Sequence, residues 1–281
     1  MKVLVTGFAG QLGHDVATEL ANRGISCIAA DKADFDLTNK ESVCGFVGAC
    51  NPDVIIHCAA YTAVDKAEED SVNCYNVNIN GTRYLCEAAS QNQAKFIYVS
   101  TDYVFDGEKT EPYEVDDATS PQSVYGVTKL EGEHIVRNST AKHFIVRTAW
   151  VFGANGNNFV KTMLRLGAER DTLNVVCDQF GSPTYTKDLA RLLCDMAQSD
   201  KYGTYHATNE GFCSWADFAC AIMHGAGLDA RVVPIPSSQY PAKAKRPMNS
   251  RLSKQKLIDN GFTPLPDWQD ALGRYLEEIK Q

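Results

Sequence analysis

Apolar and polar residues alternate through the first half of the chain in a way typical of βαβ units. Short runs rich in β-branched residues are separated by amphipathic stretches of helical length, the pattern of a parallel sheet covered by helices. The expected strands lie at 2–6, 26–30, 54–58, 95–100 and 143–148. The stretch 71–91 is expected to be one helix that covers the sheet. Its expected sheet-facing residues are Val72, Tyr75, Ile79, Thr82 and Cys86.

Beyond Trp150 the pattern loosens, which indicates a second, smaller lobe. The expected elements there are a helix at 157–169, a strand at 172–177, and helices at 186–198 and 214–226. We therefore expect an α/β fold, a Rossmann-type doubly wound parallel sheet with a smaller, mixed α/β C-terminal lobe. The segment 234–247 contains four prolines and three basic residues, which fits either an ordered loop over a cleft or a surface connection.

The composition of the chain limits which kinds of binding partner are expected. The 281 residues carry a formal charge of −8 with no basic stripe, so nucleic acid is not expected as a partner. The ten cysteines occur singly and are expected to be reduced thiols, and the six histidines form no cluster at metal-ligand spacing, so no metal site is expected. The first residues run directly into a strand, and no later run is long enough to span a bilayer. These features predict a cytoplasmic protein without membrane contact.

A glycine loop follows the first expected strand. Strand 2–6 leads into Gly7-Phe-Ala-Gly10-Gln-Leu-Gly13 and then into a helical pattern. Glycine suits this turn because a side chain would keep the backbone away from a pyrophosphate, which free amides at the helix N-terminus can hold. The loop predicts a dinucleotide site, and a tight turn without a ligand is the alternative.

Asp31 ends the second expected strand, where a carboxylate can accept hydrogen bonds from the adenosine ribose. Its charge would repel a 2′-phosphate, and the neighbouring Lys32 could offset that repulsion. The choice between NADPH and NADH therefore stays open. Asp34 and Asp36 fit ordinary turn positions.

A second motif, Tyr125-Gly-Val-Thr-Lys129, places a phenol and an ammonium on one face of a helix. A free phenol has a pKa near ~10, and a close ammonium is expected to lower it towards neutrality. The preceding strand ends near Thr101, and open α/β sheets bind ligands at such carboxyl ends. We therefore expect Thr101, Tyr125 and Lys129 to be catalytic.

In the expected reaction a hydride passes from a nicotinamide to a keto carbon while Tyr125 donates a proton to the developing alkoxide. Thr101 would help to hold the carbonyl, and Lys129 would also hold the nicotinamide ribose. The alternative is structural: Tyr125 packs in the core, Lys129 is a solvated charge and Thr101 caps a turn.

Several segments together resemble one family, the dTDP-4-dehydrorhamnose reductases of the extended short-chain dehydrogenase/reductase superfamily, over essentially the whole chain. The segments are Gly7-Phe-Ala-Gly-Gln-Leu-Gly13, Asp36-Leu-Thr38, Cys58-Ala-Ala-Tyr-Thr-Ala-Val-Asp-Lys-Ala-Glu68, Ser100-Thr-Asp-Tyr-Val-Phe-Asp-Gly107, Tyr125-Gly-Val-Thr-Lys-Leu-Glu-Gly-Glu133, Arg147-Thr-Ala-Trp-Val-Phe-Gly153 and Arg246-Pro247. The resemblance implies reduction of the C4 keto group of dTDP-4-dehydro-β-L-rhamnose to dTDP-L-rhamnose, with NADPH or NADH as cofactor.

The motifs and the resemblance together imply site residues, and the sequence pattern implies a division into domains. Cofactor contacts are expected from Gly7, Phe8, Gly10, Gln11, Leu12, Asp31, Asp36, Leu37, Ala59, Ala60, Tyr61, Tyr125 and Lys129. Substrate contacts are expected from Thr62, Val64, Thr101, Phe105, Trp150, Asn157, Asn158 and Arg246. The dinucleotide-binding domain is expected to comprise residues 1–148 with about 172–198, and the nucleotide-sugar lobe 149–171 with about 199–281.

Some members of the family use Mg²⁺ and acidic residues for dimer formation. Only Asp15 lies in a comparable place here, so the Mg²⁺ is not carried over, and either a monomer or a homodimer is expected.

Three alternative functions share some of these sequence features. A 4,6-dehydratase needs a second carboxylate where Tyr103 stands, which disfavours it. A 4-epimerase or another nucleotide-sugar 4-reductase would share the same motifs, and retention of the cofactor through purification would indicate an epimerase. A non-catalytic regulatory subunit with this fold is disfavoured by the intact Thr101, Tyr125 and Lys129.

Overall fold

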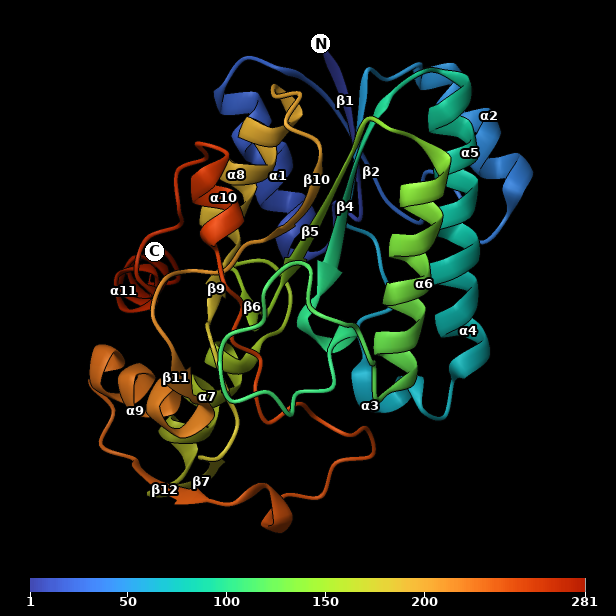
Figure 1. The fold of residues 1–281 in the computed structure, drawn as a ribbon. Helices are drawn as coiled ribbons and strands as arrows, with labels where there is room; N and C mark the ends of the chain where they lie inside the picture. Colours follow the sequence, from blue (N-terminus) through green and yellow to red (C-terminus); the bar gives the residue numbers. More distant parts are fainter. Residues whose placement is uncertain (281) are drawn as a thin grey trace.

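A six-stranded sheet in which all neighbouring strands run parallel forms the centre of the protein (Figure 1). The structure is a computed structural model that describes residues 1–280. The strands of this sheet, in the order β10-β5-β4-β3-β1-β2, are β10 (Gly203–His206), β5 (His143–Thr148), β4 (Lys95–Thr101), β3 (Val54–His57), β1 (Lys2–Thr6) and β2 (Ser26–Ala30). The chain leaves β1 towards one edge and returns as β3 on its other side. The topological switch point, where open α/β sheets bind ligands, therefore lies between β1 and β3.

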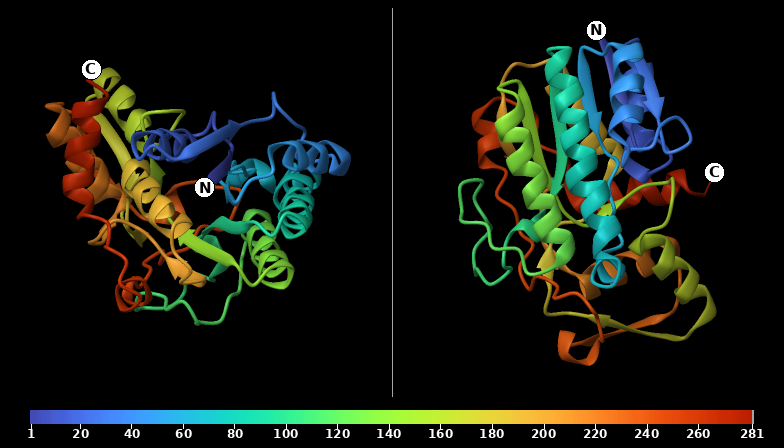
Figure 2. Two further views of the ribbon diagram at one scale, coloured as in Figure 1. Left: turned by 90° about the horizontal axis from the view of Figure 1, so that it is seen from above. Right: turned by 90° about the vertical axis from the view of Figure 1, so that its right-hand side faces the viewer.

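Helices cover both faces of the sheet (Figure 2). One face packs on α1 (Gln11–Asn22) and α8 (Thr186–Ala197) through a core that includes Val16 and Leu193. The other face packs on α2 (Lys40–Cys50), α5 (Thr82–Gln91) and α6 (Val124–Ser139). The expected Rossmann-type, doubly wound fold is confirmed.

The stretch expected to be one helix over 71–91 has three parts: α4 (Ser71–Tyr75), a π-helical segment η1 (Asn76–Gly81), and α5. A π-turn has more residues per turn than an α-helix, so the set of residues that faces the sheet changes along the helix axis. Thr82 and Cys86 are buried as expected, whereas Val72 is 71% exposed and Tyr75 is 43% exposed. The prediction that this face of the stretch 71–91 covers the sheet was therefore wrong for the first turn of the stretch.

A second lobe lies at the carboxyl end of the sheet, in the lower part of Figure 1. It has its own apolar core, which α7 (Phe159–Glu169), α9 (Trp215–Ala226) and α11 (Trp268–Glu278) share. Its short strands are β6 (Val151–Phe152), β7 (Thr172–Val176), β8 (Phe180–Gly181), β9 (Thr184–Tyr185), β11 (Cys213–Ser214) and β12 (Arg231–Ile235). The remaining short helices are α3 (Val64–Ala67), η2 (Asp102–Val104), η3 (Ser237–Gln239) and α10 (Gln255–Asp259).

Two elements lie elsewhere than the expected division had them. Strand β7 pairs with β12 in a two-stranded sheet of the second lobe rather than with the central sheet. Residues 203–206, expected in the second lobe, form β10 and extend the central sheet beside β5. The pairing partners are distant in sequence, so local pattern did not reveal them. With these two changes, the division into two lobes stays a prediction.

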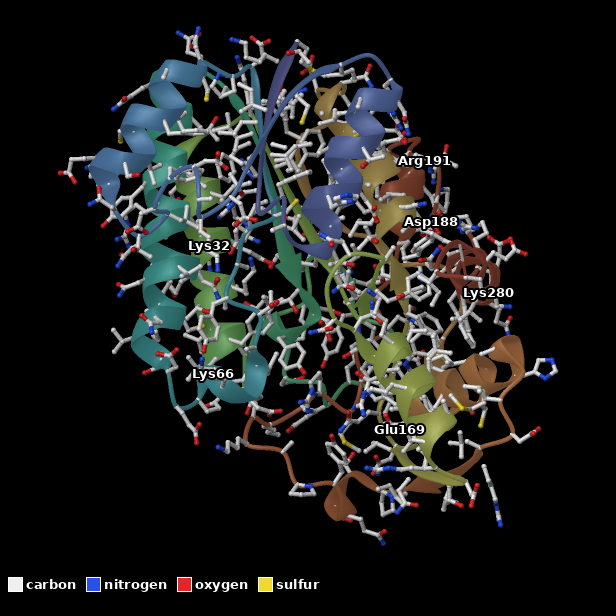
Figure 3. The ribbon with its side chains drawn as sticks, turned by 180° about the vertical axis from the view of Figure 1, so that it is seen from behind. Lys32, Lys66, Glu169, Asp188, Arg191 and Lys280 are labelled. Carbon is white, nitrogen blue, oxygen red and sulfur yellow. The ribbon has the colours of Figure 1, made fainter. Side chains whose placement is uncertain are left out.

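An ion pair joins the lobes at the back of the molecule, where Figure 3 labels Asp188 on α8. The guanidinium of Arg274 on α11 donates two hydrogen bonds to the Asp188 carboxylate, at 2.8 and 2.7 Å. The amide of Asn209 donates a third at 2.8 Å. These bonds hold α11 against α8. Within residues 1–280, no helix is long and apolar enough to cross a bilayer.

Candidate active site

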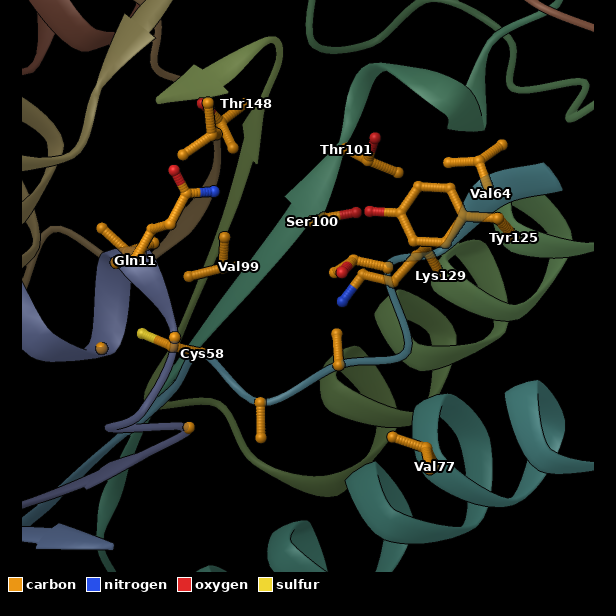
Figure 4. A pocket seen from close by; sticks show the side chains of 18 of the residues that line it. Gln11, Cys58, Val64, Val77, Val99, Ser100, Thr101, Tyr125, Lys129 and Thr148 are labelled. Carbon is orange, nitrogen blue, oxygen red and sulfur yellow. The ribbon is translucent and has the colours of Figure 1, made fainter. Parts of the chain in front are cut away.

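A cavity of about 890 Å³ opens where the central strands end and the second lobe begins (Figure 4). Most of the residues expected at a site line it. These are Gly7, Gly10, Gln11, Leu12, Asp31, Asp36, Leu37, Ala59, Ala60, Thr62, Val64, Thr101, Tyr125, Lys129, Trp150, Asn157 and Arg246. Segments from both lobes therefore meet at one cavity.

The glycine loop occupies the switch point between β1 and β3. Gly7 has φ +74°, and a Cβ there would lie 2.7 Å from the Ala59 backbone nitrogen. A Cβ on Gly13 would lie 2.2 Å from the Gly7 carbonyl oxygen. Only glycine fits at both positions. Helix α1 begins at Gln11, so its first-turn amides, which have no partner within the helix, lie at the cavity and fit a pyrophosphate.

The Asp31 carboxylate is tied to this loop. It accepts hydrogen bonds from the Ala9 amide at 2.6 Å and the Lys32 amide at 2.7 Å. Asp36 is a turn residue as well as a lining residue: its carboxylate accepts from the amide and hydroxyl of Thr38, and the hydroxyl bond chiefly lowers the pKa of Asp36. A carboxylate at Asp31 is placed to accept from ribose hydroxyls.

Thr101, Tyr125 and Lys129 group at one side of the cavity, as Figure 4 shows. Thr101 ends β4, and Tyr125 and Lys129 lie one turn apart on α6. The Lys129 ammonium lies 4.0 Å from the centre of the Tyr98 ring, and this side chain is buried rather than solvated. The Thr101 hydroxyl donates to Asp102 at 2.9 Å and accepts from the Tyr103 amide at 3.2 Å.

The pKa values differ from the expected pattern. Burial lowers the pKa of Lys129 to about 7, against a smaller opposing effect of the Glu133 charge. Burial also raises the pKa of Tyr125 above its ordinary value, and the Thr101 hydroxyl opposes this. The direction of the Tyr125 shift is therefore opposite to the expected lowering, because burial, which desolvates the phenolate, is the largest effect on this phenol.

Two glycines allow α6 to lie close enough to the sheet. A Cβ on Gly126 would lie 2.3 Å from the Tyr103 carbonyl oxygen, and a Cβ on Gly132 would lie 2.1 Å from the Tyr98 hydroxyl. The helix begins at a Ser123 cap, whose hydroxyl accepts from the Gly126 amide at 3.1 Å. The close packing of α6 on the sheet and its cap at Ser123 together fix where Tyr125 lies relative to the carboxyl ends of the strands.

Trp150 lies where the second lobe meets the sheet. Its φ is +50°, a left-handed conformation that is a true outlier for a bulky residue. Its ring stacks on Trp215 with centroids 3.6 Å apart. Another lining residue, Arg246, donates to Asp65 at 2.7 Å and to the Tyr103 hydroxyl at 3.4 Å. The Arg246 Nε is buried and has no hydrogen-bond partner among residues 1–280.

Four expected site residues are not among those that line the cavity, and their roles stay predictions. Phe8 is exposed, with its ring stacked on His14 at 5.6 Å. The Tyr61 hydroxyl donates to Asp70 at 3.0 Å.

The other two of these residues, Phe105 and Asn158, make contacts within the protein. Phe105 is 2% exposed and stacks on Tyr113 at 4.2 Å, so it belongs to the core. The Asn158 side chain caps α7 by accepting from the Lys161 amide at 3.0 Å, and it donates to Gln11 at 2.9 Å. Its amide is therefore occupied within the protein.

The sequence did not reveal several lining residues. Gln179, Trp215 and Ser250 come from the second lobe, and Thr148 ends β5 opposite Thr101. Ser250 donates to Asp102, which orients that buried carboxylate. Burial raises the pKa of Asp102 to about 6. Only the place of Thr148 at the end of a predicted strand was a signal in the sequence.

Asp15, the acidic residue that follows the glycine loop, is buried and accepts a hydrogen bond from Thr186. Burial raises its pKa. Among residues 1–280, no group of three or more histidine, cysteine or acidic side chains is arranged to hold a metal ion.

Comparison with known proteins gives consistent matches. The family model for the RmlD substrate binding domain matches residues 1–281. A dTDP-4-dehydrorhamnose reductase from Aggregatibacter actinomycetemcomitans is 44% identical, over 96% of this chain and 97% of the relative. A solved dTDP-4-dehydrorhamnose reductase from Clostridium acetobutylicum is 43% identical with a TM-score of 0.98, covering 100% of both chains. Another from Bacillus anthracis, in complex with NADP, is 42% identical with a TM-score of 0.96, covering 99% of this chain and 100% of that chain.

Proposed function

The chain belongs to the RmlD substrate binding domain family, and on that premise we propose that it is a dTDP-4-dehydrorhamnose reductase. It is an NAD(P)H-dependent oxidoreductase that reduces the C4 keto group of dTDP-4-dehydro-β-L-rhamnose to dTDP-L-rhamnose, the last step of dTDP-L-rhamnose biosynthesis. The family resemblance of the sequence is thereby confirmed. A cytoplasmic location, and a monomeric or homodimeric state, stay predictions.

One observation carries the proposal: the glycine loop and the Thr101, Tyr125 and Lys129 side chains reach the same cavity. The loop fits a dinucleotide because the absent side chains of Gly7 and Gly13 let the turn pack tightly on the backbone, and this brings the first-turn amides of α1 to the cavity. The three catalytic candidates lie on the other wall (Figure 4). A cofactor that spans this distance would bring its reactive end to Tyr125.

The chemistry needs a hydride, which a bound reduced nicotinamide supplies to the keto carbon. As the carbonyl π-electrons move to oxygen, Tyr125 donates its phenolic proton to that oxygen, which gives the alcohol. A raised Tyr125 pKa keeps the phenol protonated before the reaction. The Lys129 ammonium, if protonated, would stabilise the phenolate that remains. To help hold the carbonyl, the Thr101 hydroxyl would turn the proton that it now donates to Asp102 towards the carbonyl oxygen.

The substrate's sugar is expected to lie between the catalytic wall and the Trp150–Trp215 stack. Aromatic faces pack well against apolar sugar faces, and the Trp150 backbone strain is typical of functional sites. Arg246 is a candidate for the diphosphate, but its bond to Asp65 must be exchanged or shared. The unpartnered Arg246 Nε supports an additional contact when the substrate binds.

The test is the loss of reduced-cofactor absorbance when dTDP-4-dehydro-β-L-rhamnose is added, with NADPH and NADH in parallel. The wild type is expected to turn over, and Tyr125→Phe is expected to lose about 10²–10⁴-fold in rate while still binding cofactor. Equal rates in the two proteins would refute the role of Tyr125. A folded wild type that binds cofactor but does not turn over would refute the reductase assignment.

A further inference from the structure

Thr148 is a cavity-lining residue whose buried hydroxyl has no hydrogen-bond partner among residues 1–280. It is the last residue of β5 and is 5% exposed. Its Oγ1 is buried and makes no hydrogen bond to any residue in the range 1–280. Buried hydroxyls in proteins are nearly always paired, so one that lines a cavity is explained if a ligand supplies its partner.

The neighbouring strand separates the role of Thr148 from that of Thr101. The two threonines are register partners on parallel strands, so their side chains leave the sheet side by side. The Thr101 hydroxyl already donates to Asp102 and accepts from Tyr103. Thr148 is therefore the hydroxyl of this pair that has no partner among residues 1–280.

The surroundings of Thr148 indicate which part of a ligand it meets. Val99, Ala149 and Val151 also line the cavity, and all three are apolar. Figure 4 places Thr148 on the wall opposite Tyr125 and beside Gln11 of the glycine-loop helix. A flat, mostly apolar ring that carries one polar group fits a wall where these apolar residues lie near the Thr148 hydroxyl and the Gln11 amide.

We propose that the Thr148 hydroxyl binds the carboxamide of the nicotinamide ring and thereby fixes how the ring is turned towards the substrate. This inference rests on the proposed function, since it assumes a nicotinamide cofactor. The carboxamide has both a donor and an acceptor, and a hydroxyl can pair with either. Thr148 is a positioning residue, because the ring rather than the hydroxyl reacts.

The test compares a cofactor with a fragment of it that lacks the nicotinamide. Affinities for NADP⁺ and for 2′-phospho-ADP-ribose are measured by calorimetry on the full chain, or for NAD⁺ and ADP-ribose if the wild type prefers those. Thr148→Val removes the hydroxyl at nearly constant volume. It is expected to weaken the dinucleotide about three- to tenfold, the effect of one neutral hydrogen bond, and to leave the fragment unchanged. Thr148→Ser is expected to restore the dinucleotide affinity.

Thr208 provides a matched control. Its hydroxyl is also buried and unpartnered within the described residues, yet it does not line the cavity. Thr208→Val is expected to change neither affinity. Without ligand, the melting temperature of Thr148→Val is expected to stay the same or rise, because a methyl group replaces an unpartnered hydroxyl.

Three results would overturn the proposal: unchanged dinucleotide affinity in Thr148→Val, equal weakening of dinucleotide and fragment, or a lowered melting temperature with no rescue by Thr148→Ser. No substrate is used, so this failure is distinct from failure of the reductase assignment. If the chain binds the dinucleotide through Thr148 but does not reduce the keto sugar, this inference is supported and the reductase assignment is refuted.

Discussion

Glu133 is expected to be one of the most destabilising positions in the chain for a charge-removing substitution. Its side chain is fully buried on α6. The carboxylate accepts from the Ser100 hydroxyl at 2.6 Å, twice from Arg147 at 2.8 Å and once from Arg137 at 2.7 Å. Glu133→Gln keeps the shape but removes the charge and turns an amide N–H₂ group towards these donors.

The size of the effect follows from the burial of the partner. Arg147 is 2% exposed, so it would keep its charge in the interior without a carboxylate to balance it. Removing one partner of a buried ion pair destabilises a protein by about 3–5 kcal/mol. At about 2–4 °C per kcal/mol for a chain of roughly this size, the melting temperature is expected to fall by about 6–20 °C.

Urea unfolding followed by circular dichroism measures this change. The midpoint of Glu133→Gln is expected to fall with little change in slope. Glu169→Gln is the matched control, because that side chain is 53% exposed and pairs with Arg165 one helical turn away. The control is expected to lose less than about 1 kcal/mol. Arg147→Met is expected to lower the free energy of unfolding less in the Glu133→Gln background than in the wild type.

The pH dependence gives a second check. Burial acts to raise the pKa of Glu133, but the hydrogen bonds and charge of Arg147 outweigh it, so the pKa is lowered. A lowered carboxyl pKa contributes stability above the unfolded value, about 4.3 for glutamate, and loses it as the pH falls through the folded value. The difference in free energy of unfolding between the wild type and Glu133→Gln should therefore narrow as the pH falls into the acid range. Equal losses at Glu133 and Glu169 at neutral pH would refute the reasoning.

Three further predictions concern the site and its support. Because the pKa of Lys129 is lowered to about 7, cofactor affinity is expected to fall as the pH rises through that value, and titrations of Lys129→Met should lack this step. Gly132→Ala is expected to destabilise by about 1–3 kcal/mol in thermal melts, because the Cβ would lie 2.1 Å from the Tyr98 hydroxyl, whereas Gly45→Ala, with open space around it, should not. Asp31→Asn is expected to shift the NADPH-to-NADH ratio of KM roughly fivefold towards NADPH, since like charges about 4 Å apart in water repel by about 1 kcal/mol; an unchanged ratio would contradict this.

The sequence alone determined most of the central sheet and the local motifs. The strands at 2–6, 26–30 and 143–148 have the predicted bounds, β3 ends one residue earlier, and β4 continues one residue further. Strand and helix periods, glycine loops and a Tyr-x-x-x-Lys spacing are short-range features, so neighbouring residues are enough to encode them.

The tertiary structure decided which distant residues share the site and what their surroundings do to them. Strand β10 is four residues long and is recognised only by its pairing with β5. Phe105 and Asn158 resemble site residues by position, but packing against Tyr113 and capping of α7 use them within the protein. Thr148 became a candidate only through its unpartnered hydroxyl. Burial and partners arise from chain segments far apart in sequence, and desolvation depends on all of them together, so no local pattern specifies them.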